Sequence, residues 1–129
     1  MRESELRRKI KKKLESKGWL CFTLVAPTRT IIKNGQQIWI PSRGQLFDMV
    51  AIKDQTGIPI ELKSKTGQYK PAQKRRQTWA ADAANTIFAL IKESKKKGKI
   101  RLEFPNKEPC ISDMRLSARL EDDLKEMLE

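Results

Sequence analysis

Residues 58–63 read IPIELK, with the two-residue alternation of a β-strand. Ile58, Ile60 and Leu62 would point to one face of a sheet, and Glu61 and Lys63 together to the other. Burying an acid and a lysine on an otherwise apolar strand is costly unless the pair serves a purpose. The alternative is that Glu61 and Lys63 form an ordinary ion pair on an edge strand.

The preceding segment, residues 46–53 (LFDMVAIK), predicts a neighbouring strand. Residues 54–57 would form the turn between the two strands, giving a hairpin at the centre of a sheet. Such pairing brings Asp48, near the start of the first strand, towards Glu61. Two converging carboxylates make an oxygen-rich site for a hard cation such as Mg²⁺. There Lys63 would orient a water molecule or stabilise charge that develops on a phosphoryl group.

A basic helix is predicted over residues 2–17, with Leu6, Ile10 and Leu14 along one face. Glu3 falls within this apolar stripe, whereas Glu5 falls on the far side. Glu3 is therefore expected to reach the sheet edge as a third carboxylate, with Glu5 as its substitute. Favourable interaction with the helix dipole explains an acid at this position equally well.

The remaining segments alternate between strands and helices. A buried strand is expected over residues 19–25, and a hairpin over 30–40 with an Asn34-Gly35 turn. Two further strands are expected over 85–91 and 100–104, and an amphipathic helix over 112–129. Another helix begins at Pro71, and its predicted apolar stripe consists of Ala72, Trp79, Ala80 and Ala83. The order is roughly αββββαββα, which indicates a mixed α/β class.

Composition narrows the classes of function. The 129 residues suffice for one domain with one core, and 28 Lys and Arg against 16 Asp and Glu give a net charge of +12. Such an excess attracts polyanions and neutralises phosphates. The absence of histidine excludes His-based zinc sites and Ser–His or Cys–His catalysis. Two cysteines form no disulfide framework, and neither a signal peptide nor a membrane span is expected, which favours a cytoplasmic location.

A spacing motif joins these residues. Asp48 is followed by twelve residues and then Glu61-Leu62-Lys63, and the run continues as IELKSKTGQYKPAQKRRQ. This pattern resembles the PD-(D/E)XK nuclease superfamily and, more narrowly, the VRR-NUC (virus-type replication-repair nuclease) family. The resemblance implies a restriction-endonuclease-like core with a mixed central sheet flanked by helices, over about residues 3–91. Residues 92–129 would be a C-terminal extension of the same domain. One departure is the loop GQLFD at 44–48, which is one residue longer than usual and lacks the customary proline.

The resemblance also implies roles for single residues. Asp48, Glu61 and Glu3 would bind Mg²⁺, for which Mn²⁺ could substitute, and Lys63 would be the catalytic lysine. Gln73 would lie beside this lysine and the scissile phosphate, although without the motif it is an ordinary polar helix residue. Ser42 and Gln45 are further candidates for phosphate contact. Apart from the resemblance, their positive charge makes Arg43, Lys65, Lys70, Lys74, Arg75 and Arg76 the expected contacts to the DNA backbone, although a solvated face is the simpler explanation for any single one.

Small members of the family look like phage-encoded homodimers that resolve four-way (Holliday) DNA junctions. The expectation is therefore a metal-dependent, structure-selective DNA endonuclease that acts on branched DNA in the cytoplasm of a bacterial host. A homodimer would pair through residues 38–40 of the hairpin or through the C-terminal helix, although core packing explains both apolar segments equally well. Two alternatives stay open: another PD-(D/E)XK activity (flap, exonucleolytic or restriction-type), and a non-catalytic basic DNA-binding module.

Overall fold

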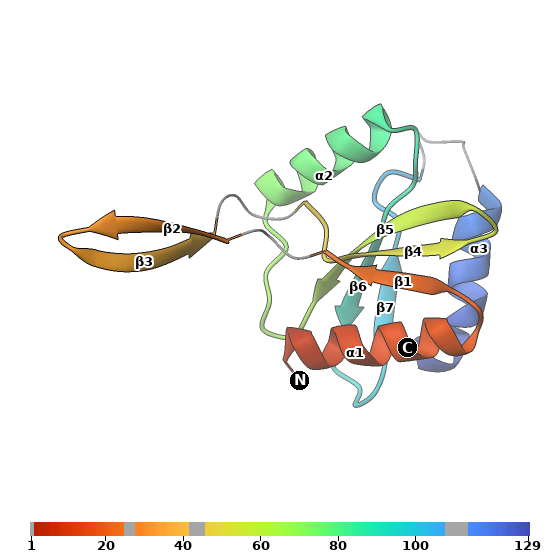
Figure 1. Cartoon of the computed structure of the whole chain (residues 1–129). Helices are drawn as coiled ribbons and strands as arrows, with labels where there is room; N and C mark the ends of the chain where they lie inside the picture. Colours follow the sequence, from red (N-terminus) through yellow and green to blue (C-terminus); the bar gives the residue numbers. More distant parts are fainter. Residues whose placement is uncertain (1, 25–27, 42–45, 108–113) are drawn as a thin grey trace.

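The computed structural model describes residues 2–24, 28–41, 46–107 and 114–129. Within these ranges three α-helices, seven strands and one short 3₁₀ helix follow one another along the chain (Figure 1). Their bounds are α1 (Glu3–Ser16), β1 (Leu20–Thr23), β2 (Thr28–Lys33), β3 (Gln36–Pro41), β4 (Met49–Lys53), β5 (Thr56–Lys63), α2 (Pro71–Ala83), β6 (Ala89–Glu93), β7 (Ile100–Glu103), α3 (Met114–Asp123) and η1 (Lys125–Met127). The seven strands match the seven segments predicted as strands, which the rough order αββββαββα undercounts by one.

The central sheet has five strands in the order β1-β4-β5-β6-β7. β5 lies in the middle, antiparallel to β4 and parallel to β6, so the sheet is mixed. The β4–β5 hairpin confirms the pairing that the sequence predicts, and its two-residue turn places Asp54 and Gln55 at φ values of 52° and 66°. α2 provides the crossover that a parallel β5–β6 pair requires. The strand that carries Glu61 and Lys63 is therefore central, not an edge strand.

Helices cover both faces of this sheet (Figure 1). The predicted stripe of Leu6, Ile10 and Leu14 is buried, and it packs in one cluster with the inward residues of β5. Leu120 and Leu124 join the same cluster, so α3 contributes to the core beside α1. On the opposite face, α2 packs through a smaller cluster that consists of Phe47, Ala81 and Phe88. This arrangement leaves the carboxyl end of β5 between α1 and α2.

The β2–β3 hairpin forms a separate two-stranded sheet that extends away from the body (Figure 1). Its predicted turn is confirmed: Asn34 and Gly35 have φ values of 53° and 75°, the left-handed backbone that a two-residue hairpin turn needs. The side chains of residues 32–37 at the tip are exposed. Those of residues 38–40, proposed for a dimer interface, lie outside the described side chains.

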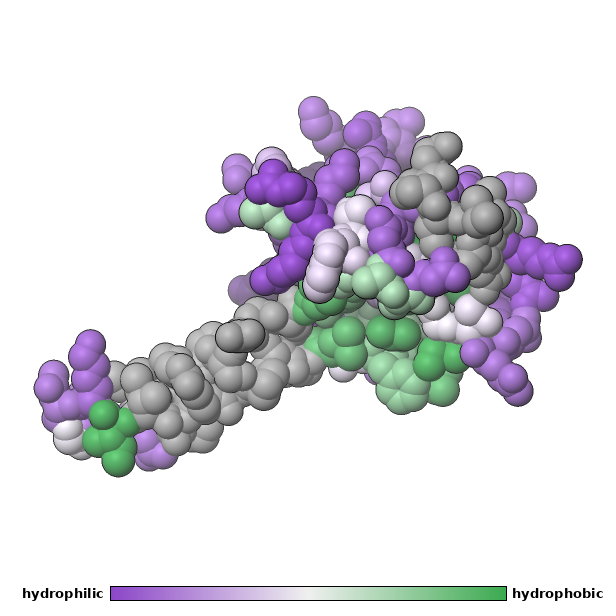
Figure 2. Space-filling view, turned by 90° about the horizontal axis from the view of Figure 1, so that it is seen from above, coloured by the Kyte–Doolittle hydropathy of each residue, from purple (hydrophilic) through white to green (hydrophobic). Residues whose placement is uncertain are grey.

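β1 differs from the buried strand expected over residues 19–25. It is an edge strand, and while Cys21 is buried, Leu20 and Phe22 are 55% and 50% exposed because they point to the opposite face. A space-filling view shows a mostly hydrophilic surface with a hydrophobic area on the body beside the base of the hairpin (Figure 2). β1 is therefore buried on one face only, and its residues alternate between buried and exposed.

The orientation of α2 is the larger error of the sequence prediction. Of the expected apolar stripe, Trp79 is 74% exposed, and Ala72 and Ala83 are exposed as well. The buried residues of this helix are Gln77 and Ala81 instead. The inward face instead carries Gln73 and Gln77, whose side chains donate hydrogen bonds to the buried carboxylate of Glu61.

Smaller boundary differences have local causes. Asn85, with φ at 51°, ends the α2 region, so β6 begins only at Ala89. The C-terminal helix ends at Asp123 and not near residue 129, and a 3₁₀ turn follows it. No helix in the described ranges is long and apolar enough to cross a membrane.

Candidate active site

Asp48 is held by its backbone between two strands of the sheet. Its N–H donates to the carbonyl of Ile60 (3.1 Å), and its carbonyl accepts from the N–H of Leu24 (2.9 Å). The side chain crosses to β5, where Oδ2 accepts from the backbone N–H of Leu62 at 2.7 Å. The structure thus brings Asp48 to the strand position that carries Glu61, as the hairpin pairing predicts.

Glu61 is 4% exposed, and three side chains donate to or contact its carboxylate. Oε2 accepts a hydrogen bond from Nε2 of Gln77 at 2.5 Å, and Oε1 accepts one from Nε2 of Gln73 at 3.2 Å. The ammonium of Lys63 lies 3.6 Å from Oε1. Glu61, Lys63 and Gln73, three residues proposed from the sequence, therefore meet at one carboxylate.

Burial and the neighbouring Asp48 change the protonation of Glu61. Burial, followed by the charge of Asp48 and a hydrogen bond to it, raises the pKa of Glu61 from 4.5 to about 8. The hydrogen bond from Gln77 and the charge of Lys63 act in the opposite direction. A raised pKa is the ordinary consequence of placing a carboxylate out of water beside another carboxylate. A cation between Asp48 and Glu61 would remove this repulsion.

The donor set fits a hard divalent cation. Mg²⁺ is commonly held by one or two carboxylates, with water and substrate phosphate oxygens completing its octahedral shell. Asp48 and Glu61 supply two such carboxylates. Among the described residues, no three acidic, histidine or cysteine side chains form a group able to hold a metal ion.

Glu3 is accordingly not assembled with Asp48 and Glu61 into the predicted three-carboxylate group. The apolar stripe of α1 ends at Leu6, and Glu3 lies one turn beyond it in the exposed first turn, as does its predicted substitute Glu5. Helical periodicity placed Glu3 in line with the apolar stripe, but burial begins only at Leu6 and the first turn stays exposed.

A hollow of about 250 Å³ adjoins the site at the carboxyl end of β5. Lys63 and Lys92 are register partners on β5 and β6, and together with Lys65 they place three ammonium groups around it. Ser64, Gly67, Tyr69 and Glu93 complete the lining. Glu93 is engaged, since its carboxylate accepts from the backbone N–H of Lys65 at 3.0 Å. This excess of positive charge beside Glu61 suits an anion.

The other predicted DNA contacts follow β5 along the chain, in the turn after it and in α2. All of them that the structure describes have exposed side chains, and they are Lys65, Lys70, Lys74, Arg75 and Arg76. Lys70 precedes the first turn of α2, and the last three lie on α2 itself. Arg43, like Ser42 and Gln45, lies outside the described residues.

Two residues of the site were not proposed from the sequence. Gln77 is fully buried, and besides its bond to Glu61 its Nε2 donates to the carbonyl of Leu46 at 2.7 Å. Its Oε1 accepts from the hydroxyl of Tyr69 at 2.5 Å. The available signal was spacing: Gln73 and Gln77 are four residues apart and so share one helix face. The spacing was not used because the other face of α2 was predicted to be the buried one.

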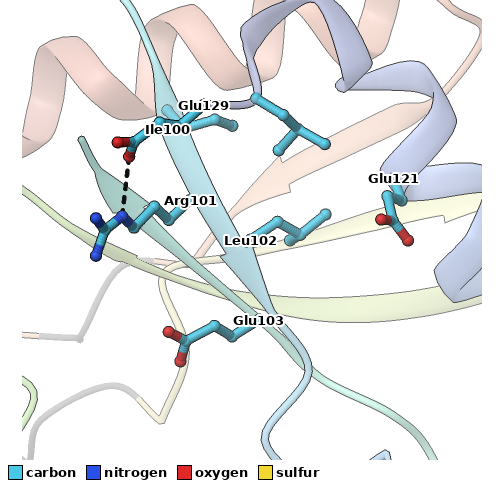
Figure 3. Close-up of a pocket in the computed structure, with 7 residues that line it drawn as sticks. Ile100, Arg101, Leu102, Glu103, Glu121 and Glu129 are labelled. Carbon is cyan, nitrogen blue, oxygen red and sulfur yellow. Dashed lines mark hydrogen bonds and ion pairs between the residues drawn. The ribbon is translucent and has the colours of Figure 1, made fainter. Parts of the chain in front are cut away.

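A second hollow, of about 370 Å³, lies on the outer side of β7 and has a different character. Figure 3 shows its lining, in which Glu129 accepts a hydrogen bond from Arg101 at 2.9 Å. Glu103 and Glu121 add two further carboxylates. Three acids against one arginine do not suit a polyanion, and β7 is separated from β5 by β6. This acidic hollow is therefore separate from the site at the carboxyl end of β5.

Comparison with known proteins supports the fold. The sequence matches no family model and no curated protein. The structure is similar to that of Hjc, a Holliday junction resolvase from the archaeal hyperthermophile Archaeoglobus fulgidus, with a TM-score of 0.55 and 11% sequence identity. The match covers 80% of this chain and 72% of that one. It confirms the predicted fold class, a mixed central sheet flanked by helices, and it does not test the resemblance to the VRR-NUC family.

Proposed function

We propose that this protein is a divalent-metal-dependent DNA endonuclease that cuts four-way junctions as a homodimer. One observation carries the proposal: Asp48, Glu61 and Lys63 converge at one end of β5. They do so within a fold that a Holliday junction resolvase shares. The high positive charge of the chain agrees with a polyanionic substrate.

Asp48 and Glu61 would hold Mg²⁺ or Mn²⁺. The chemistry that a bound cation supplies is polarisation of a phosphoryl oxygen and a lower pKa for a bound water. Lys63 contributes a positive charge 3.6 Å from Oε1 of Glu61, where it stabilises the additional negative charge of the phosphoryl transition state. Gln73 donates to the same oxygen and keeps it directed away from the interior.

The substrate is bound through its backbone. Lys65, Lys70, Lys74, Arg75 and Arg76 are exposed around Lys63 and along α2, where they position phosphates without reading bases. Junction resolution needs two incisions related by symmetry, and a two-fold dimer supplies two identical sites for them.

The test uses labelled four-way junction, flap, linear duplex and single-stranded DNA, each with Mg²⁺, Mn²⁺ or EDTA. We expect symmetric paired cuts in the junction with metal and none in EDTA. Asp48→Asn and Lys63→Ala should each lower the cleavage rate at least about a hundredfold. They should leave DNA binding largely intact, because affinity comes mainly from phosphate contacts elsewhere.

Matched controls are Asp122→Asn and Lys125→Ala, which alter exposed residues of the α3–η1 region with no contact to the site. Both should cut at the wild-type rate. Cutting of every substrate would retain the nuclease and discard junction selectivity. Binding without cutting under any metal would identify a DNA-binding module instead.

A further inference from the structure

The side chain of Gln77 uses all of its hydrogen-bonding groups although it is fully buried. Its Nε2 donates to the Leu46 carbonyl (2.7 Å) and to Oε2 of Glu61 (2.5 Å), and its Oε1 accepts from the Tyr69 hydroxyl (2.5 Å). A backbone carbonyl can only accept, so the amide nitrogen must face Leu46. The orientation of the whole amide follows from that one partner.

This orientation determines the state of the next groups. With its nitrogen towards Leu46, Gln77 presents its second N–H to Glu61, so Oε2 of that carboxylate must act as an acceptor. The amide oxygen is left for Tyr69, which must act as a donor. The other oxygen of Glu61, Oε1, faces Lys63 and Gln73. One oxygen is thus tied to the interior, and the other is turned towards the lysine.

A merely structural residue would not need this chemistry. The neighbouring inward residues of the α2 face are Phe47, Ala81 and Phe88, an apolar cluster in which an amide costs free energy unless fully paired. Of the three partners, Tyr69 and Leu46 are half-buried residues, whereas Glu61 is 4% exposed. The remaining partner, the buried carboxylate of Glu61, is the one that needs a donor.

We propose that Tyr69 and Gln77 are positioning residues that hold the Glu61 carboxylate in the orientation that binds the divalent cation. This inference rests on the proposed function. Hydrogen-bond partners behind a metal ligand fix its orientation, and their loss typically weakens metal binding about 10- to 100-fold. Tyr69 also lines the lysine-rich hollow, so it connects the surface beside Lys63 to the interior partner of Glu61.

The experiment measures Mn²⁺ binding by isothermal titration calorimetry on the full chain without DNA. Gln77→Met keeps the approximate volume and removes all three hydrogen bonds, and Tyr69→Phe removes a single hydroxyl. Gln68→Met is the matched control, because Gln68 is an exposed glutamine next to Tyr69. We expect the Mn²⁺ affinity to fall about 10- to 100-fold in Gln77→Met. A loss of severalfold is expected in Tyr69→Phe, and none in Gln68→Met.

A second measurement separates positioning from general damage. In cleavage assays the Mg²⁺ concentration for half-maximal rate should rise in both variants, while the KM for DNA stays unchanged. Wild-type Mn²⁺ affinity in folded Tyr69→Phe and Gln77→Met would overturn the positioning role and leave the nuclease proposal standing. Absence of Mn²⁺ binding by the wild-type protein would overturn the proposed function, and this inference with it. If Gln77→Met does not fold, Tyr69→Phe decides the matter alone.

Discussion

Glu61 is the residue at which stability and the proposed chemistry oppose each other. Its isolation from water and its closeness to Asp48 raise the pKa to about 8, so that near neutral pH the folded chain without a cation holds a proton there. An unfolded chain would have released that proton above pH 4.5. A bound cation therefore stabilises the charged form of this carboxylate more than it would stabilise that of an exposed one.

This difference predicts how stability depends on pH. The folded state binds more protons than the unfolded state between pH 4.5 and about 8, so the free energy of unfolding should fall as pH rises through that window and level off above it. The slope for one proton is at most about 1.4 kcal/mol per pH unit. Urea denaturation in EDTA across the window measures it.

Two other groups with shifted pKa values do not titrate in the upper part of this pH window. The pKa of Asp123 lies below its ordinary 3.8, and the pKa of Cys21 lies above its ordinary 9.0, so neither titrates from about pH 5 to about pH 8. Glu61→Gln should flatten the profile, whereas the exposed control Glu121→Gln should not. A flat wild-type profile would contradict the raised pKa.

At the scale of an element, α2 packs on the sheet through a face that includes two glutamines bonded to Glu61. Its first turn begins at Pro71 as the sequence predicts, but the helix turns Gln73 and Gln77 inward to Glu61. Trp79 is consequently left 74% exposed. Trp19, by contrast, is buried, and its indole N–H donates to Asp123 at 2.7 Å, which joins the start of β1 to α3.

The two tryptophans make a matched pair for testing this arrangement. Trp19→Ala should lower the free energy of unfolding by about 3–5 kcal/mol, the usual cost of removing a buried aromatic side chain. Trp79→Ala should change it by no more than about 0.5 kcal/mol, as expected for an exposed residue. Urea denaturation followed by circular dichroism measures both. A comparable loss in the two variants would mean that α2 docks through the alanine and Trp79 face after all.

At the scale of the whole molecule, the net charge of +12 attracts polyanions, and the carboxyl end of β5 gathers several of the basic residues. Basic residues lie on both sides of the carboxyl end of β5, on the turn after it and on α2. The hollow at β7 is acidic instead. DNA bound at the first of these surfaces would have its phosphates beside Lys63, whereas the carboxylates at β7 would repel them.

Salt dependence tests this account. Lys74→Ala and Arg75→Ala should each weaken DNA binding about equally for all sequences and reduce the slope of log affinity against log salt concentration by about 1. Fluorescence anisotropy in EDTA over a range of NaCl concentrations measures the slope without cleavage. Lys125→Ala, an exposed lysine of η1, should leave it unchanged. Equal effects of all three substitutions would show that the positive charge acts without a defined surface.

The sequence by itself determined the features that depend on a few neighbouring residues. Alternation in residues 58–63 fixed which face Glu61 and Lys63 share, Asn34-Gly35 defined the hairpin turn, and the stripe from Leu6 to Leu14 defined the buried side of α1. The spacing of Asp48 and Glu61 was sufficient to pair them across β4 and β5. Backbone geometry determines these turns, faces and pairings between residues that are close in the sequence, so the residue pattern predicts them.

Only the tertiary structure decided the features that depend on what packs opposite. Whether Glu3 reaches the site depends on what packs against the first turn of α1, which is exposed, and the exposure of Leu20 depends on what covers that face of β1. The roles of Tyr69 and Gln77 follow from the buried carboxylate across from them. Burial and hydrogen bonding depend on both of the surfaces that pack together. The residue pattern of one segment does not reveal which segment will pack against it.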